Sequence, residues 1–170
     1  MDLYDKDTLE LINAIASFTP ESTYILKINI ENKNITFFDT TFIDDMAFLF
    51  MNEIFFNKLL LWNTQNVRNM SMMFKNCKMF NKSLYWDVSN VEYMFQMFYN
   101  AYNFNKKIKW KVSKLKTCDF MFENATKLSK APIFIDSINI NTALSIFKNT
   151  NIGFKKIDKY SFTNNLVLDP

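Results

Sequence analysis

Two consecutive stretches of the sequence repeat each other: WNTQNVRNMSMMFKNCKMFNKSLY at residues 62–85 and WDVSNVEYMFQMFYNAYNFNKKIK at residues 86–109. Trp86 follows Trp62 by 24 positions, and Trp110 follows Trp86 by the same interval. A fixed period of about 20–50 residues is typical of repeat proteins, in which each unit buries its apolar face against its neighbours. The spacing therefore predicts about five stacked units of 24 residues.

Apolar residues recur within each unit at offsets of three, six and seven positions. The resulting columns are Ile43, Val67, Val91, Leu115; Met46, Met70, Met94, Cys118; Leu49, Met73, Met97, Met121; and Phe50, Phe74, Phe98, Phe122. These offsets favour one face of a short helix. Ser89 followed by Glu92 matches a capping box ahead of that face.

An asparagine stands two residues beyond the phenylalanine in every unit. The column is Asn52, Asn76, Asn100, Asn124 and Asn149. Asparagine tolerates left-handed backbone geometry, and its amide can bond to neighbouring backbone. We expect this column to end each helix and close each turn of the coil.

The remainder of each unit alternates apolar and polar residues, as at residues 60–64, 84–88 and 108–112. This alternation predicts a short, half-buried strand. One strand and one short helix per unit predict an α/β repeat solenoid with a parallel sheet on one side. Pro132 falls in an inward column of the fourth unit, where we expect it to weaken or bulge the sheet.

The pattern W-D-V-S-N-V-x-x-M-x-x-M-F-x-x-A-x-x-F-N at residues 86–105 resembles the repeat of the BspA-type, leucine-rich-repeat-like surface proteins. Such repeats occur in mycoplasma surface lipoproteins, in large DNA viruses and in some protists. The resemblance covers residues 38–149, with decay at both ends. It implies a leucine-rich-repeat-like solenoid that serves adhesion or interaction, and it carries no catalytic residues to this chain.

The repeat region divides the chain into three parts. Residues 1–34 are expected to form an N-terminal cap, with a helix over residues 5–18 and a hairpin whose second strand is residues 35–38. Residues 35–157 form the repeat solenoid. Residues 158–170 are expected to be a C-terminal cap or tail.

Composition argues against most enzyme classes. The chain has no His and only one Gly among 170 residues, which removes the commonest general base, most catalytic zinc sites and the glycine-rich phosphate loops. We expect no catalysis, no cofactor and no metal. Cys77 and Cys118 lie two units apart, about 10 Å, so we expect two buried, reduced thiols rather than a disulfide.

The N-terminus MDLYDKDTLE is acidic and has no basic region followed by an apolar one. It does not match a signal peptide, and it has no cysteine that could take a lipid. No apolar run reaches the length of a membrane span. We therefore expect an intracellular or virion-associated protein.

Charge is unevenly distributed along the chain. Residues 1–60 hold four Lys and ten Asp or Glu (net −6), and residues 61–170 hold sixteen Lys or Arg and seven Asp or Glu (net +9), which together give +3. The densest basic run lies at residues 106–116. Nucleic acid is not the favoured partner, because the chain has one Arg and its repeated aromatic residues occupy inward columns.

The outward positions of the predicted strands provide a candidate partner-binding surface. It comprises Leu61, Tyr85, Asp87, Lys107, Lys109, Lys111, Ile133 and Ile135. Exposed apolar residues beside lysines suit a protein interface. We expect a scaffold that binds a protein through this surface. The alternative is an architectural protein that self-associates between its acidic N-terminal and basic C-terminal parts.

Overall fold

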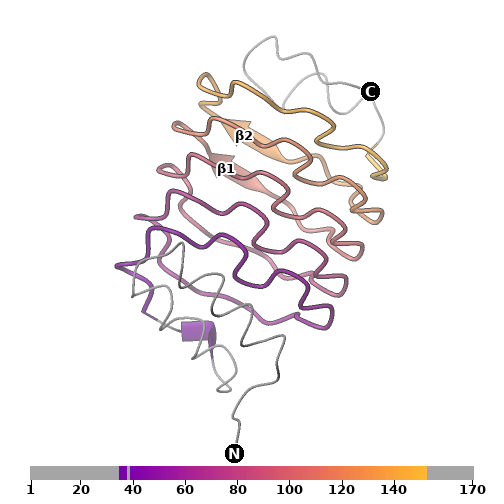
Figure 1. Cartoon of the computed structure of the whole chain (residues 1–170), viewed down its shortest axis with the longest axis horizontal. Helices are drawn as coiled ribbons and strands as arrows, with labels where there is room; N and C mark the ends of the chain where they lie inside the picture. The colour runs from indigo at the N-terminus through magenta and orange to yellow at the C-terminus, as the bar shows by residue number, and fades with distance from the viewer. Residues whose placement is uncertain (1–34, 38, 153–170) are drawn as a thin grey trace, which may run out of the picture.

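The computed structural model describes residues 35–37 and 39–152. Over this range the backbone runs in successive coils that lie one above another (Figure 1). The assigned elements are the 3-10 helix η1 (Ile35–Phe37) and the strands β1 (Lys109–Lys111) and β2 (Ile133–Ile135). The expected cap (residues 1–34), the end of the repeat region (153–157) and the tail (158–170) lie outside the described residues.

Strands β1 and β2 form a parallel pair in neighbouring coils (Figure 1). Lys109 pairs with Ile133 and Lys111 with Ile135, so the register equals the 24-residue repeat. The expected weakening at Pro132 is wrong. The ladder starts at the next residue, where the Ile133 N–H donates to the Ile108 carbonyl at 3.0 Å. Pro132, which has no N–H to donate, therefore precedes the first paired residue and removes no hydrogen bond from the ladder.

The other predicted strands are not formed as strands. Residues 60–64 and 84–88 alternate between buried and exposed side chains as expected, yet within residues 39–152 only β1 and β2 are assigned as strands. The expected strand at residues 35–38 is also wrong, because Ile35–Phe37 is the 3-10 helix η1. Contacts between coils persist here: the Leu61 N–H donates to the Thr36 carbonyl at 2.9 Å.

The predicted short helices are replaced by consecutive turns. In the unit at residues 70–77, the N–H groups of Met73, Lys75 and Cys77 each donate to the carbonyl three residues earlier, at 3.1–3.3 Å. The N–H groups between them point to the next coil, where Phe74 donates to the Met97 carbonyl at 2.9 Å and Asn76 to the Tyr99 carbonyl at 2.8 Å. Backbone N–H groups therefore bond alternately within their own turn and to the neighbouring coil. An α-helix cannot produce this pattern, because each of its N–H groups donates to the carbonyl four residues earlier.

Left-handed residues explain why the described repeat units form turns at the positions where helices were expected. Met72 has φ 57° and Asn76 has φ 62°, and each is the third residue of a turn closed by an N–H donating back three positions. A positive φ at that position is the requirement of a type II turn. The same geometry recurs in every unit, at Phe48, Met72, Gln96, Phe120 and Ser145 and at the asparagine column.

The asparagine column forms a continuous side-chain ladder. The amide Nδ2 of Asn76 donates to Oδ1 of Asn52 at 2.7 Å, and the bonds onward to Asn100, Asn124 and Asn149 measure 2.8–2.9 Å. All five residues have positive φ between 58° and 71°. The predicted left-handed, stacked role of asparagine is confirmed, although the asparagines close turns rather than helices.

A large aromatic core fills the interior. Phe74 lies between Phe50 and Phe98, with ring centroids 5.4 Å from each, and it also stacks on Phe80 at 4.1 Å. The rings form two parallel stacks that run from coil to coil. One stack contains Phe50, Phe74, Phe98, Phe122 and Phe147, and the other contains Phe56, Phe80 and Phe104. Trp86 closes the strand side of the core, and its indole N–H donates to the Leu60 carbonyl at 3.2 Å.

Candidate interaction surface

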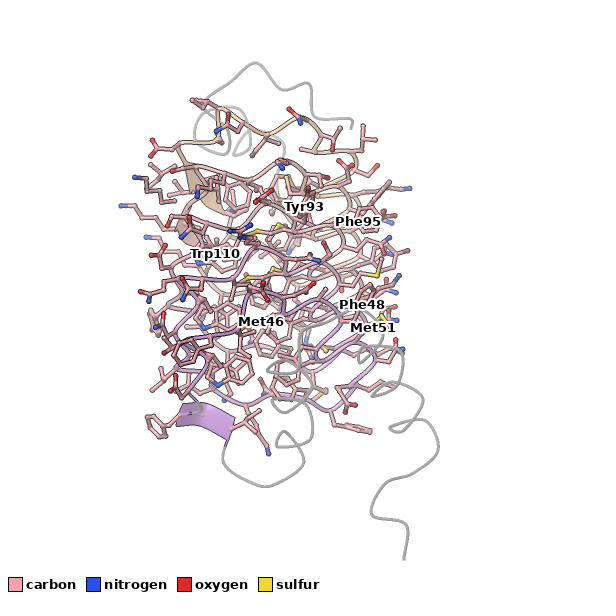
Figure 2. All side chains as sticks on the ribbon, turned by 60° about the vertical axis from the view of Figure 1, so that its left-hand side comes forward. Met46, Phe48, Met51, Tyr93, Phe95 and Trp110 are labelled. Carbon is pink, nitrogen blue, oxygen red and sulfur yellow. The ribbon has the colours of Figure 1, made fainter. Side chains whose placement is uncertain are left out.

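The predicted site residues lie together on the strand side of the coils. Figure 2 places Trp110 on this side and Phe48, Met51 and Phe95 on the side of the turns. Because the register follows the repeat, Leu61, Tyr85, Lys109 and Ile133 occupy one column across four coils. Asp87, Lys111 and Ile135 form the next column, and Lys107 lies beside the first. The structure thus places all eight predicted residues on one face.

Their exposure follows the predicted alternation. Tyr85 is 80% exposed, whereas its sequence neighbours Leu84 and Trp86 are buried. Lys107, Lys109, Lys111 and Asp87 are exposed, as are Leu61 and Ile135. Ile133 is half-buried, so it contributes less to the face than expected.

A shallow groove crosses this face. Its lining residues are Ser83, Leu84, Tyr85, Trp86, Lys107, Lys109 and Trp110. Its exposed lining consists of the Tyr85 ring beside Lys107 and Lys109, whereas Trp86 and Trp110 are almost completely buried. Such a groove can accept an apolar side chain whose flanking residues are acidic.

The charges of the second column are already partly paired. Lys111 Nζ lies 3.4 Å from a carboxylate oxygen of Asp136. Hydrogen bonds from Ser89 lower the pKa of Asp87 below its usual value, and the positive charge of Lys111 acts in the same direction. Asp87 is therefore ionised at neutral pH. Lys107 and Lys109 make no ion pair among the described residues, so their charges are available to a partner.

A second basic feature was not among the predicted site residues. Lys58, Lys82, Lys106 and Lys130 recur at intervals of 24 and occupy the position just before the strand side in four successive coils. We call this column the lysine ladder. Its signal was present in the sequence, because the interval between its members equals the repeat.

Both cysteines are buried and free of a disulfide, as expected. Removal from water raises the pKa of each thiol far above its ordinary value. The Cys77 thiol donates to the Phe50 carbonyl at 2.8 Å. Buried, protonated thiols are poor nucleophiles, so neither residue is a candidate for catalysis.

Two further properties concern only the described part of the chain. In residues 39–152 and η1, no three His, Cys, Asp or Glu side chains are grouped closely enough to hold a metal ion. No helix within the same residues is long and apolar enough to cross a membrane.

Comparison with known proteins identifies the family. None of the curated proteins and none of the solved structures matches the chain. One protein family, described as "Mycoplasma protein of unknown function, DUF285", matches residues 21–137, which is more than two thirds of the chain. The matched range contains residues 86–105, which carry the resemblance to the BspA-type proteins, so the predicted relationship is confirmed. The chain belongs to the DUF285 family.

Proposed function

We propose that this chain is a non-catalytic, leucine-rich-repeat-like solenoid that binds another protein through its strand side and its lysine-rich middle. The observation that carries the proposal is the exposure of Tyr85, a residue that is 80% exposed and lines the groove with Lys107 and Lys109. Tyrosine combines a large apolar ring with a polar tip and is enriched in the energetically important part of protein interfaces.

The scaffold supports this use because the face is held rigidly from behind. Trp86 and Trp110 line the groove and are buried, and the Trp86 ring stacks on Phe74 with centroids 6.1 Å apart. Because the backbone that carries the exposed residues is anchored by this core, docking of a partner orders side chains but does not have to order a loop. The exposed residues of the same face can therefore vary without disturbing the core.

A matched pair of variants tests the proposal. The face variant Tyr85→Ala, Lys109→Ala is compared with the control Tyr102→Ala, Lys127→Ala. The control removes another tyrosine and another exposed lysine, which lie on adjacent coils and outside the groove, with the Lys127 N–H donating to the Tyr102 carbonyl at 3.1 Å. Tagged wild type and both variants are used to capture proteins from the source lysate, and a captured protein is purified for calorimetric titration.

We expect one protein to be recovered by the wild type and the control but not by the face variant. Its dissociation constant should rise by at least about tenfold for the face variant, because loss of an interface hot spot costs about 2 kcal/mol or more and about 1.4 kcal/mol corresponds to tenfold. Equal affinity of the two variants, or recovery of no protein by the wild type, would refute the proposal. Self-association that weakens with salt, seen by light scattering, would favour the architectural alternative instead.

A further inference from the structure

The lysine ladder is held in register by the residues that precede it. The Asn81 N–H donates to Oδ1 of Asn57 at 3.0 Å, and the Asn105 N–H donates to Oδ1 of Asn81 at the same distance. The Ser129 N–H continues the series to Asn105 at 3.1 Å. Each of these four residues immediately precedes a ladder lysine. The four lysines therefore start from equivalent points in successive coils, about 5 Å apart.

None of the ladder lysines is neutralised within the described part of the chain. The ion pairs found there involve Lys111, Lys116 and Lys148. Lys58 and Lys130 are exposed, and Lys82 and Lys106 are half-buried. The ladder is thus a row of like charges that is exposed at its two ends and half-buried in its middle.

Another column of the same protein shows that stacked charges need not be alike. Asp44, Arg68, Glu92 and Lys116 also recur every 24 residues, and their signs alternate. Backbone bonds of 2.7–2.8 Å link neighbouring members, and Lys116 Nζ reaches the Glu92 carboxylate at 2.5 Å. Like charges placed opposite each other in neighbouring strands are destabilising, whereas opposite charges stabilise. Four lysines in one column consequently do not serve the stability of the fold.

We propose that the lysine ladder is the binding strip for an extended acidic polypeptide segment of a partner protein. This inference deepens the proposed function, on which it rests, by naming the chemistry of the partner. The ladder spans three coil spacings, about 14 Å, and an extended chain rises about 3.3 Å per residue. A segment of about five residues matches that length. Its alternate side chains point the same way, so three carboxylates at every second position can face the lysines.

Two features favour a polypeptide over a nucleic acid. The ladder consists entirely of lysine, whereas arginine is preferred where phosphates are bound in a bidentate manner; the one arginine, Arg68, lies in the alternating column. The ladder also borders the groove that contains Tyr85, Trp86 and Trp110. An acidic segment can place an apolar side chain against Tyr85. Single strands stack successive bases on several aromatic side chains, and Tyr85 is the one exposed aromatic residue among the described residues that line this groove.

The test uses the full chain and a labelled peptide of seven residues that alternates glutamate and threonine. Fluorescence anisotropy gives its dissociation constant for wild type, for the ladder variant Lys82→Gln, Lys106→Gln, and for the control Lys114→Gln, Lys127→Gln. Both double variants remove two positive charges, and the control lysines are exposed, lie outside the ladder and make no ion pair among the described residues. The face variant and a labelled oligothymidylate complete the set, and melting temperatures check folding.

We expect the ladder variant to bind the peptide at least about tenfold more weakly than wild type, while the control stays within about twofold. Equal weakening of both would show that net charge alone attracts the peptide, and no binding by wild type would be equally decisive against the proposal. Tighter binding of oligothymidylate than of the peptide would overturn the choice of a polypeptide. Loss of peptide binding in the ladder variant but not in the face variant would support the ladder and separate it from the groove.

Discussion

The side-chain amide of Asn100 donates to Oδ1 of Asn76 at 2.8 Å and its own Oδ1 accepts from Asn124 at 2.9 Å, while its backbone holds a φ of 58°. One residue type therefore satisfies two demands. It tolerates the left-handed geometry that the turn requires, and it links three coils through its amide.

Substitution of Asn100 separates these two contributions. Asn100→Gly keeps the left-handed geometry without strain but removes the ladder bonds, whereas Asn100→Ala loses both. We expect Asn100→Ala to lower the free energy of unfolding by about 2–4 kcal/mol. The loss for Asn100→Gly should be about 1–2 kcal/mol smaller than the loss for Asn100→Ala, because glycine adopts a positive φ without strain. Urea denaturation of the three proteins measures the difference. Equal losses would show that backbone geometry contributes nothing at this position.

The stacked phenylalanines predict a large cavity effect. Phe98 is completely buried, with ring centroids 5.4 Å from Phe74 and 5.3 Å from Phe122. Phe98→Ala is expected to cost about 3–5 kcal/mol of unfolding free energy. Phe98→Leu, which refills part of the space, should cost clearly less. Thermal or urea unfolding measures both, and a loss below about 1 kcal/mol for the alanine variant would contradict the packing described for the core.

The sequence predicted the stacking but not the local backbone. The asparagine column could be recognised because asparagine itself signals left-handed turns. The other left-handed column contains Phe48, Met72, Gln96, Phe120 and Ser145, none of which is a glycine or an asparagine. Without that signal, apolar residues at offsets of three, six and seven positions match one face of a helix. Consecutive turns bury the same residues in the core, so the pattern of apolar residues does not distinguish the two structures.

The predicted surface could be identified from the alternation alone, since seven of its eight residues are exposed and Ile133 is half-buried. Alternation reports burial but not hydrogen bonding, so it could not distinguish the paired strands β1 and β2 from residues 60–64 and 84–88. The lysine ladder could have been recognised from the 24-residue period alone, because Lys58 and Lys130 are the first and last members of a series with that spacing.

The buried thiols predict a dependence of stability on alkaline pH. Burial keeps the pKa of Cys77 raised in the folded protein, so the thiol stays protonated there while it ionises near pH 8.5 when unfolded. Its stabilising contribution is complete below the unfolded pKa and declines as the pH rises above it. At pH 10 the loss is about 2 kcal/mol per thiol.

Cys77→Ala tests this dependence with little disturbance of packing, because Ala101 and Ala125 occupy the equivalent buried positions. Urea unfolding at pH 7, 8, 9 and 10 (chosen to bracket the thiol pKa of about 8.5) should show a loss between pH 8 and pH 10 about 2 kcal/mol smaller in the variant than in the wild type. Other titrating groups are common to both proteins and cancel in the comparison. Parallel pH profiles would mean that Cys77 ionises as readily in the folded state as in the unfolded one.

The ion pair between Lys111 and Asp136 should matter little for stability, although it lies on the candidate surface. Its atoms are 3.4 Å apart, and both side chains are more than half exposed. Exposed pairs contribute about 0–1 kcal/mol. A double-mutant cycle with Lys111→Ala and Asp136→Ala, measured by urea unfolding, should therefore give a coupling energy below about 1 kcal/mol. A larger coupling would mean that Lys111 is held for the fold, and a binding defect in its variants could then no longer be assigned to a lost partner contact.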